Sequence, residues 1–519
     1  MKKEFNITGI CRPLKHYAAD ISGKLTQTLQ MVEMGRYFII NRPRQYGKTT
    51  MLYTIERVLM DSGSYLVFNI SFEGIGDAIF EDEKVFAPGF IRLLQTQAKY
   101  HTPQLLPFLK EKEKEVDSLE SLSDALTDIL LETEKQSVLL IDEVDKSSNN
   151  QLFISFLAML RNKYLAQDKV KTFHSVILAG VHDVKTLKLK MRPDVEQKYN
   201  SPWNIATEFK VDMNLHPHEI KPMLDEYAAD KGVKMDTQHI AETLFYYTSG
   251  YPFLVSKLCK MLDEDYPETI GTVKEWTDYD LEIAVQQLVK ESNTNFDSLI
   301  KNVENNPDLY DLVYKIAVDG DSFPFNIHNP TTNLGILYGI FIDNNGVKIH
   351  NRIYSEVLLN YMSIKILQTK MSKTDLGRLY KNDDGTLNME AVMLGFQAFM
   401  KKEYSKKDRD FLEKNGRLVF LAFLKPIING SGYDFKEAQI SDEKRLDVVI
   451  THLKEKYVAE LKIWRGQKAH EKGLIQLVDY LNTQGLNEGY LLIFDHSEVK
   501  NWHSEWLTVQ DKKILAVWV

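Results

Sequence analysis

The stretch NRPRQYGKTT, residues 41–50, ends in Gly47-Lys48-Thr49 and stands between an apolar run and a segment with helical spacing. A phosphate-binding loop needs backbone amides at a helix N-terminus, a lysine for the phosphate charge and a hydroxyl for Mg²⁺. The stretch supplies all three, but Arg42 stands where the usual pattern has its first glycine. Because GKTT alone is also a common turn, a second feature has to decide.

The sequence SVLLIDEVD, residues 137–145, is that second feature. It has the pattern of an apolar strand that ends in Asp142 and Glu143. An acid at the tip of such a strand can hold the Mg²⁺ shell, and the next acid can polarise the attacking water. Acids after a strand are common by themselves. Both features in this order, each in its required context, predict a P-loop nucleotide-binding fold.

Apolar strands alternate with helical segments over residues 1–215, which predicts an α/β fold with a parallel sheet covered on both faces. A helix is expected after the loop, at residues 48–63. The expected strands are residues 36–43, 64–74, 137–145, 174–181 and 204–215.

Helices dominate residues 216–292, and residues 293–365 add further helices and a hairpin that turns at Asn344-Asn345-Gly346. This order is typical of a winged helix-turn-helix, which reads DNA or acts as a spacer. The expected recognition helix has few basic residues, which favours the spacer.

Two stretches near the C-terminus alternate apolar and polar residues, KRLDVVITH at 444–452 and KYVAELKIWRG at 456–466. A hairpin through the intervening LKEK sets Asp447 opposite Lys462 and Val449 opposite Glu460. Asp447, Glu460 and Lys462 then share one face, with the two carboxylates as diagonal neighbours.

Two carboxylates and the backbone carbonyl of Leu461 suit Mg²⁺ or Mn²⁺, and the lysine can orient a water. Such residues on an exposed sheet face are also routinely only solvated.

The loop RPRQYGKTT resembles the Arg-Pro-Arg-x-aromatic-Gly-Lys-[Ser/Thr] loop of bacterial AAA-ATPase-like proteins, in which arginine usually replaces the first glycine. SGYPFLVSKLCK, residues 249–260, resembles the Gly-x-Pro element in the lid of related signal-transduction NTPases, where the proline approaches the nucleotide. A plain helix start is the alternative there. The resemblance implies ATP with Mg²⁺ held by Thr49 and Asp142, and Glu143 as the catalytic acid. Physically, Arg42 or Arg44 can add charge near the phosphates, although a solvated arginine would give the same sequence. The implied nucleotide-binding residues are Arg44, Gly47, Lys48, Thr49, Thr50 and Pro252.

Asp447 with Glu460-x-Lys462 resembles the PD-(D/E)xK phosphodiesterase superfamily, which includes restriction-type nucleases. HEKGLIQLVDYLNT, residues 470–483, places Gln476 and Tyr480 one turn apart and resembles the Gln-x-x-x-Tyr helix of one subgroup. The usual proline before the first acid is Leu446 here. The resemblance implies a restriction-endonuclease-like domain. Its catalytic residues would be Asp447, Glu460, Lys462 and Gln476, with metal ligands Asp447, Glu460 and Leu461.

Composition limits the function classes. The 519 residues carry a net charge of -9, so the chain as a whole is not a basic nucleic-acid binder. Two cysteines exclude a disulfide framework and lead us to expect a cytoplasmic protein. No apolar run approaches the length of a membrane span.

The expected function is therefore an ATP-binding and ATP-hydrolysing protein that regulates a metal-dependent nuclease. The alternative is a nucleotide-dependent switch or scaffold whose C-terminal domain binds nucleic acid or protein without cutting. Expected partners are ATP and nucleic acid, with DNA favoured over RNA, no membrane, and homo-oligomer formation left open.

The expected parts are an ATPase core (1–215), a helical lid (216–292), a winged-helix-like part (293–365), a linker (366–385) and a nuclease-like domain (386–519).

Overall fold

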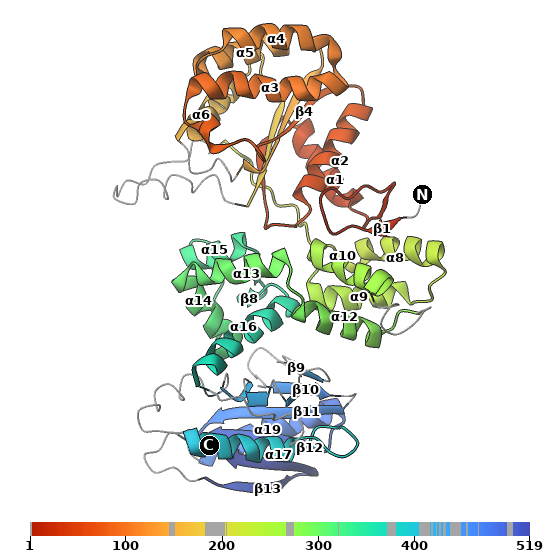
Figure 1. Ribbon diagram of the computed structural model, residues 1–519, viewed down its shortest axis with the longest axis vertical. Coiled ribbons are helices and arrows are strands. Elements are labelled where there is room, and N and C mark those ends of the chain that lie inside the picture. Colours follow the sequence, from red (N-terminus) through yellow and green to blue (C-terminus); the bar gives the residue numbers. More distant parts are fainter. Residues whose placement is uncertain are drawn as a thin grey trace. The chain divides into compact units, whose positions relative to one another are not determined.

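A parallel four-stranded sheet in the order β3-β6-β5-β4 forms the centre of the N-terminal part of the chain in the computed structural model (Figure 1). These strands occupy four of the five predicted positions. Their bounds are Tyr37–Asn41 (β3), Tyr65–Ser71 (β4), Gln136–Asp142 (β5) and Ser175–Gly180 (β6).

The structure describes residues 3–144, 151–181, 203, 205–265, 275–319, 321–370, 380–403, 416, 419–421, 423–424, 427–428, 432–435, 448–452, 455–464, 467–495 and 502–519. By its contacts the chain divides into two units, residues 1–309 with 324–354, and residues 310–323 with 355–519. No helix within the described residues is long and apolar enough to cross a bilayer.

Helices cover both faces of the sheet because the strands are apolar on both sides. Alternate strand residues such as Tyr37, Phe68 and Leu139 pack with α3, α5 and α6 in one core. The opposite face meets α2, whose buried side includes Leu52 and Ile55. Figure 1 shows α3 to α6 on one side of β4 and α1 and α2 on the other. The helices are Ser22–Glu33 (α1), Lys48–Asp61 (α2), Glu83–His101 (α3), Leu106–Glu115 (α4), Leu119–Leu131 (α5) and Gln151–Leu165 (α6).

The strand predicted at 204–215 does not form, and this expectation was wrong. In the described part of that segment only Thr207 bridges to Phe38 of β3. The apolar residues still alternate inward, with Phe209 and Val211 buried. The sheet strand beside them, β3, ends at Asn41, so no ladder partner is left for residues 209–215.

A group of helices follows the sheet. Pro217 begins α8 at its first turn, and Gly232 ends it in the left-handed conformation, with φ 67°. Asp236 caps α9 by accepting from the amide of His239. The bounds are Pro217–Lys231 (α8), Thr237–Thr248 (α9), Pro252–Lys260 (α10) and Asp278–Lys290 (α12). A two-stranded pairing of β1 (Glu4–Phe5) with β2 (His16–Tyr17) precedes α1.

The hairpin predicted around Asn344-Asn345-Gly346 is present as β7 and β8. Asn345 and Gly346 both have positive φ, at 53° and 122°, which is why this turn favours asparagine and glycine. α16 continues to Lys370, into the segment expected to be a linker. The elements are Thr294–Glu304 (α13), Pro307–Tyr314 (α14), Pro330–Leu337 (α15), Phe341–Asp343 (β7), Val347–Ile349 (β8) and Arg352–Lys370 (α16).

The second unit contains a mixed sheet in the order β13-β14-β12-β11-β10-β9. Its centre is parallel, and α19 links β11 to β12 and packs Leu477 and Leu481 on Val458 and Leu491. The bounds are Met389–Glu403 (α17), Gly432–Phe435 (β9), Val448–His452 (β10), Glu455–Ile463 (β11), Gln467–Gln484 (α19), Glu488–Phe494 (β12), Ser504–Val509 (β13) and Lys512–Trp518 (β14).

The predicted register of the β10–β11 hairpin was wrong by two residues. Val449 lies opposite Val458, not opposite Glu460, and the ladder continues to His452 opposite Glu455. Glu455 and Lys456, which we expected in the turn, belong to β11, so that the connection consists of residues 453–454. A shift of two residues keeps each side chain on its face, because side chains alternate with a period of two.

Candidate functional site

The loop between β3 and α2 presents a helix N-terminus at the end of the strand. Gly47 is the N-cap of α2 and has φ 80°, a conformation that glycine adopts without strain. A Cβ placed on Gly47 would meet no atom within 4 Å, so the glycine serves the backbone turn and not a tight contact. The first amides of α2 are thereby turned toward the loop, as an anion site needs.

Lys48 folds back across this loop. Its Nζ donates to the carbonyl oxygen of Pro43 at 2.8 Å and to that of Arg42 at 3.0 Å, and the side chain is buried. The ammonium is held inside the ring of backbone where phosphate oxygens would lie in a P-loop.

Thr49 and Asp142, the two residues expected to hold Mg²⁺, lie in contact. Thr49 Oγ1 donates to Asp142 Oδ2 at 2.7 Å, although β6 separates β3 from β5 in the sheet. The buried carboxylate also accepts from the amide of Glu143 at 2.9 Å through Oδ1. Glu143 has φ 56°, a left-handed backbone that is uncommon outside glycine and marks a strained turn at the strand tip.

These groups fit a nucleotide with its magnesium ion. Lys48 offers positive charge, the start of α2 offers amide donors, and Thr49 and Asp142 offer two oxygen ligands of the kind Mg²⁺ prefers. The ion, when bound, neutralises charge on the phosphates. The chain's own contribution is to hold the lysine and the two oxygens at one edge of the sheet.

The other predicted nucleotide-binding residues lie around the loop in different roles. Arg44 is exposed, and its carbonyl oxygen accepts from the hydroxyl of Tyr251 at 2.6 Å. Thr50 Oγ1 accepts from the amide of Cys11 at 3.0 Å and so contacts the N-terminal segment. Pro252 is the first residue of α10, and the hydrogen bond to the loop comes from the hydroxyl of its neighbour Tyr251.

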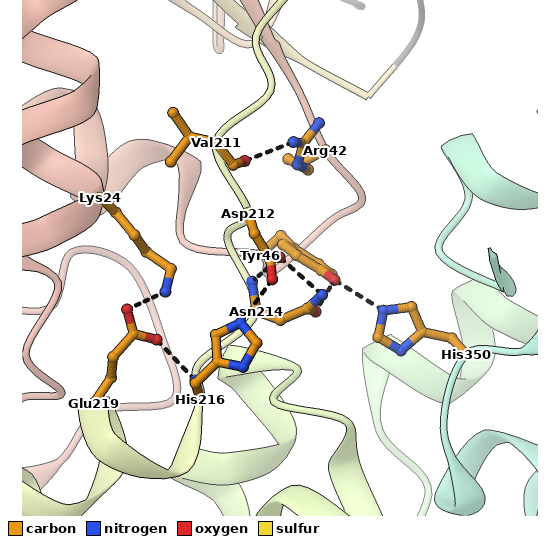
Figure 2. Close-up of polar contacts among 9 residues, drawn as sticks. All are labelled: Lys24, Arg42, Tyr46, Val211, Asp212, Asn214, His216, Glu219 and His350. Atoms are coloured by element: carbon orange, nitrogen blue, oxygen red, sulfur yellow. Dashed lines mark hydrogen bonds and ion pairs between the residues drawn. The ribbon is translucent and has the colours of Figure 1, made fainter. Parts of the chain in front are cut away.

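The side chain of Arg42, one of the two that we expected to add charge near the phosphates, is held by backbone carbonyl oxygens. Its guanidinium donates to the carbonyl oxygen of Val211 at 2.8 Å (Figure 2). It also donates to the carbonyl oxygen of Asn41 at 2.8 Å. Burial lowers the pKa of this guanidinium, an effect that Tyr46 and Asp212 oppose.

Several side chains that no sequence pattern indicated pack on the loop. The hydroxyl of buried Tyr46 contacts the Asn214 side chain and lies 2.8 Å from Nε2 of His350, as Figure 2 shows. Gln45 accepts from Asn295 at 2.9 Å. Burial lowers the pKa of His350 to about 4, so this ring is neutral near pH 7. The only sequence signal was the aromatic residue at position 46, since the partners are distant along the chain.

The second unit brings three of the predicted catalytic residues together. Lys462 Nζ lies 2.8 Å from Glu460 Oε1 and 3.4 Å from Gln476 Oε1 of α19. Glu460 is fully buried and Lys462 is partly exposed. Asp447 lies outside the described residues.

Leu461 is buried in β11, paired in register with Leu492 of β12. Tyr480 of α19 is buried in the core of the second unit. Among the described residues, no group of three or more His, Cys, Asp and Glu side chains is arranged to hold a metal ion. Glu460, Lys462 and Gln476 thus form an acid-lysine-amide cluster on one face of the sheet.

Comparisons with known proteins give similar solved structures and one family model. Among solved structures, similar chains include the Walker-type ATPase PABY2304 of Pyrococcus abyssi, with 14% identity over 68% of this chain and 99% of that chain, at TM-score 0.47. The Aeropyrum pernix ORC2 protein is similar with 14% identity over 70% of this chain and 97% of that chain, at TM-score 0.34. The Thermotoga maritima RuvB Holliday junction branch migration motor is similar with 14% identity over 65% of this chain and 93% of that chain, at TM-score 0.34.

No curated protein matches the sequence. The family model described as an AAA-like domain matches residues 19–269, which contain Lys48, Thr49 and Asp142. The chain therefore contains an AAA-like domain with a nucleotide-binding P-loop fold over residues 19–269.

Proposed function

We propose that the protein binds and hydrolyses ATP with Mg²⁺ at the loop of residues 41–50, and that this cycle regulates a metal-dependent phosphodiesterase site on β11 and α19 that cuts nucleic acid. The observation that carries the nucleotide half is the hydrogen bond of 2.7 Å between Thr49 and Asp142. It joins the loop hydroxyl to the strand-tip acid, the two groups that a P-loop ATPase needs on one Mg²⁺.

The roles within this site follow from position. Lys48 neutralises phosphate charge, and Thr49 and Asp142 hold the ion. Glu143, directly after the strand tip, orients the attacking water. Arg44, Thr50 and Pro252 remain proposed contributors at the rim of the site.

The nuclease function is supported by the cluster of Glu460 and Lys462 of β11 with Gln476 of α19. A carboxylate and a lysine two residues apart on a strand lie on the same face, where the acid can bind Mg²⁺ or Mn²⁺ and the ammonium can stabilise phosphate charge. We propose Asp447 and the carbonyl of Leu461 as further ligands, with DNA favoured as substrate. We also propose that the protein is cytoplasmic, forms homo-oligomers and is divided into the five parts expected from the sequence.

One observation favours the alternative, a switch whose C-terminal domain does not cut. Glu460 is fully buried and already paired with Lys462. Removing a carboxylate from water is costly unless it is paired, so the ion pair can be a purely structural feature.

The test measures cleavage of plasmid, linear and single-stranded DNA and of RNA by the purified full-length protein. Each substrate is tested with and without divalent metal and with and without ATP. The proposal expects Mg²⁺- or Mn²⁺-dependent cleavage that changes with ATP and is lost in Glu460→Gln. Lys48→Ala should lose only the response to ATP. ATP turnover without cleavage of any substrate would support the switch instead.

A further inference from the structure

Arg42 holds the segment that leads from the sheet to α8, here called the connecting segment and defined as residues 205–216. Its guanidinium donates to the carbonyl oxygen of Val211 at 2.8 Å and reaches that of Phe209 at 3.5 Å. The same group lies over the Phe209 ring, 5.4 Å from its centroid. That ring stacks on Phe38 of β3, with centroids 5.8 Å apart. The guanidinium thus replaces the missing strand ladder as the partner of these carbonyl oxygens.

Tyr46 makes a second tie from the same loop to the same segment. Its buried hydroxyl donates to Oδ1 of Asn214. The Asn214 side chain is itself fixed, because its Nδ2 and its backbone amide both donate to Asp212 Oδ1, at 3.0 and 2.9 Å. Figure 2 shows the two ties, Arg42 to Val211 and Tyr46 to Asn214, along one stretch of chain.

The connecting segment is joined firmly to the helices that come after it. Asp212 Oδ2 contacts Nε2 of His216 at 2.8 Å, and the His216 amide donates to Glu219 in the first turn of α8 at 2.7 Å. The amide of Leu215 donates to the carbonyl oxygen of Gly250 at 2.8 Å, just before α10. A shift of residues 209–214 is therefore passed to α8 and α10.

Arg42 connects the phosphate-binding lysine to the connecting segment. Lys48 Nζ donates to the carbonyl oxygen of Arg42, whose side chain holds Val211. Phosphate oxygens bound by the Lys48 ammonium would compete with this carbonyl oxygen and so act on the backbone that carries the guanidinium. The same residue is thus tied to the phosphate-binding lysine through its backbone and to the connecting segment through its side chain.

We propose that Arg42 and Tyr46 are positioning residues that clamp the phosphate loop to the connecting segment and transmit nucleotide occupancy to α8 and α10. Arg42 in place of the usual glycine is then a part of this coupling and not a phosphate ligand. The proposal rests on nucleotide binding at the loop.

The test is hydrogen exchange of residues 205–216 in the full-length protein, with and without ATP and Mg²⁺, alongside ATP affinity. Without nucleotide, Arg42→Gly should raise exchange in this segment about tenfold, since it removes charge-assisted hydrogen bonds. In the wild type ATP should change the exchange of the segment. In Arg42→Gly that response should vanish, while ATP affinity stays within about tenfold of wild type.

Two further variants and one control sharpen the result. Tyr46→Phe keeps the ring, which packs 4.6 Å from Tyr251, and loses only the hydroxyl, so it should weaken the response without unfolding the loop. Arg42→Lys keeps the charge without the planar fork and should restore the response only in part. Arg57→Ala, which removes an exposed arginine of α2, should behave as wild type.

An Arg42→Gly protein that responds to ATP as the wild type does would overturn the clamp. So would a folded Arg42→Gly protein that has lost ATP binding by more than a hundredfold, because Arg42 would then be a phosphate ligand. If the wild type itself binds no ATP, the nucleotide site fails. The exchange comparison without nucleotide still decides whether the two residues hold the segment. If Arg42→Gly does not fold, Tyr46→Phe decides the question by the same readout.

Discussion

Lys24 of α1 and Glu219 of α8 form an ion pair in which both side chains are buried (Figure 2). The pair joins the sheet-covering part of the chain to the first helix after the connecting segment. Glu219 also accepts from the His216 amide, so its carboxylate is satisfied on both oxygens. Such a pair is costly to break, because each charge has lost its water.

Glu219→Gln should therefore destabilise the protein by about 3–5 kcal/mol, since it leaves the Lys24 charge buried without its counter-charge. Thermal melting or denaturant unfolding measures the change. Lys221→Met is the matched control on the same helix, because Lys221 and Asp225 form an exposed pair at 2.7 Å. Its cost should be at most about 1 kcal/mol. Equal effects of the two substitutions would show that burial of the first pair does not matter.

Gly250→Ala should be much more destabilising than Gly63→Ala, although both glycines have the same left-handed backbone, with φ 73° and 74°. A Cβ on Gly250 would lie 2.3 Å from the carbonyl oxygen of Leu215, whereas one on Gly63 meets nothing within 4 Å. The conformational strain of about 1–2 kcal/mol is common to both, and only the first adds a backbone clash. A difference in melting temperature close to zero would contradict this account of the connecting segment.

His350 should make the protein less stable as the pH falls below about 6.5. Burial holds its folded pKa near 4, with Asp212 opposing the shift, while the unfolded ring titrates near its ordinary value. Between these two pKa values the unfolded chain binds more protons than the folded one, so stability rises with pH through this window and is lost on acidification. The full effect is on the order of 3 kcal/mol.

The measurement is the difference in melting temperature between the wild type and His350→Gln from pH 7 to pH 4. Glutamine does not titrate, and its amide can still donate to Tyr46, so the wild type should lose stability relative to the variant as the pH falls. A difference that is independent of pH would mean that the buried ring does not titrate in this range.

The sequence was sufficient for those parts of the site that depend on local patterns. The loop, the helix after it and the strand that ends in Asp142 each carry their own signal. The loop and the end of β5 come together because the carboxyl ends of parallel strands lie at one edge of a sheet, which brings Asp142 to Thr49. The contact of Arg42 with Val211 had no such signal, because it joins residues 169 positions apart through a carbonyl oxygen that any residue type offers.

The C-terminal hairpin shows a different limit. The alternation of β11 predicted that Glu460 and Lys462 share a face, and they do so in contact. The predicted register was wrong because the connection can use two or all four residues of LKEK. Both choices bury the same face of each strand, so the alternation of residue types does not distinguish them. Pattern alone fixes the face of a strand, while turn geometry fixes its partner.

Calorimetric titration with ATP, in the presence and absence of Mg²⁺, decides whether the loop from Arg42 to Thr49 binds the nucleotide and its ion. The wild type should bind ATP, more tightly with Mg²⁺. Lys48→Ala should weaken binding at least tenfold to a hundredfold through loss of charge-assisted hydrogen bonds. No binding by the wild type, or binding that is indifferent to the loss of Lys48, would contradict nucleotide binding at this loop.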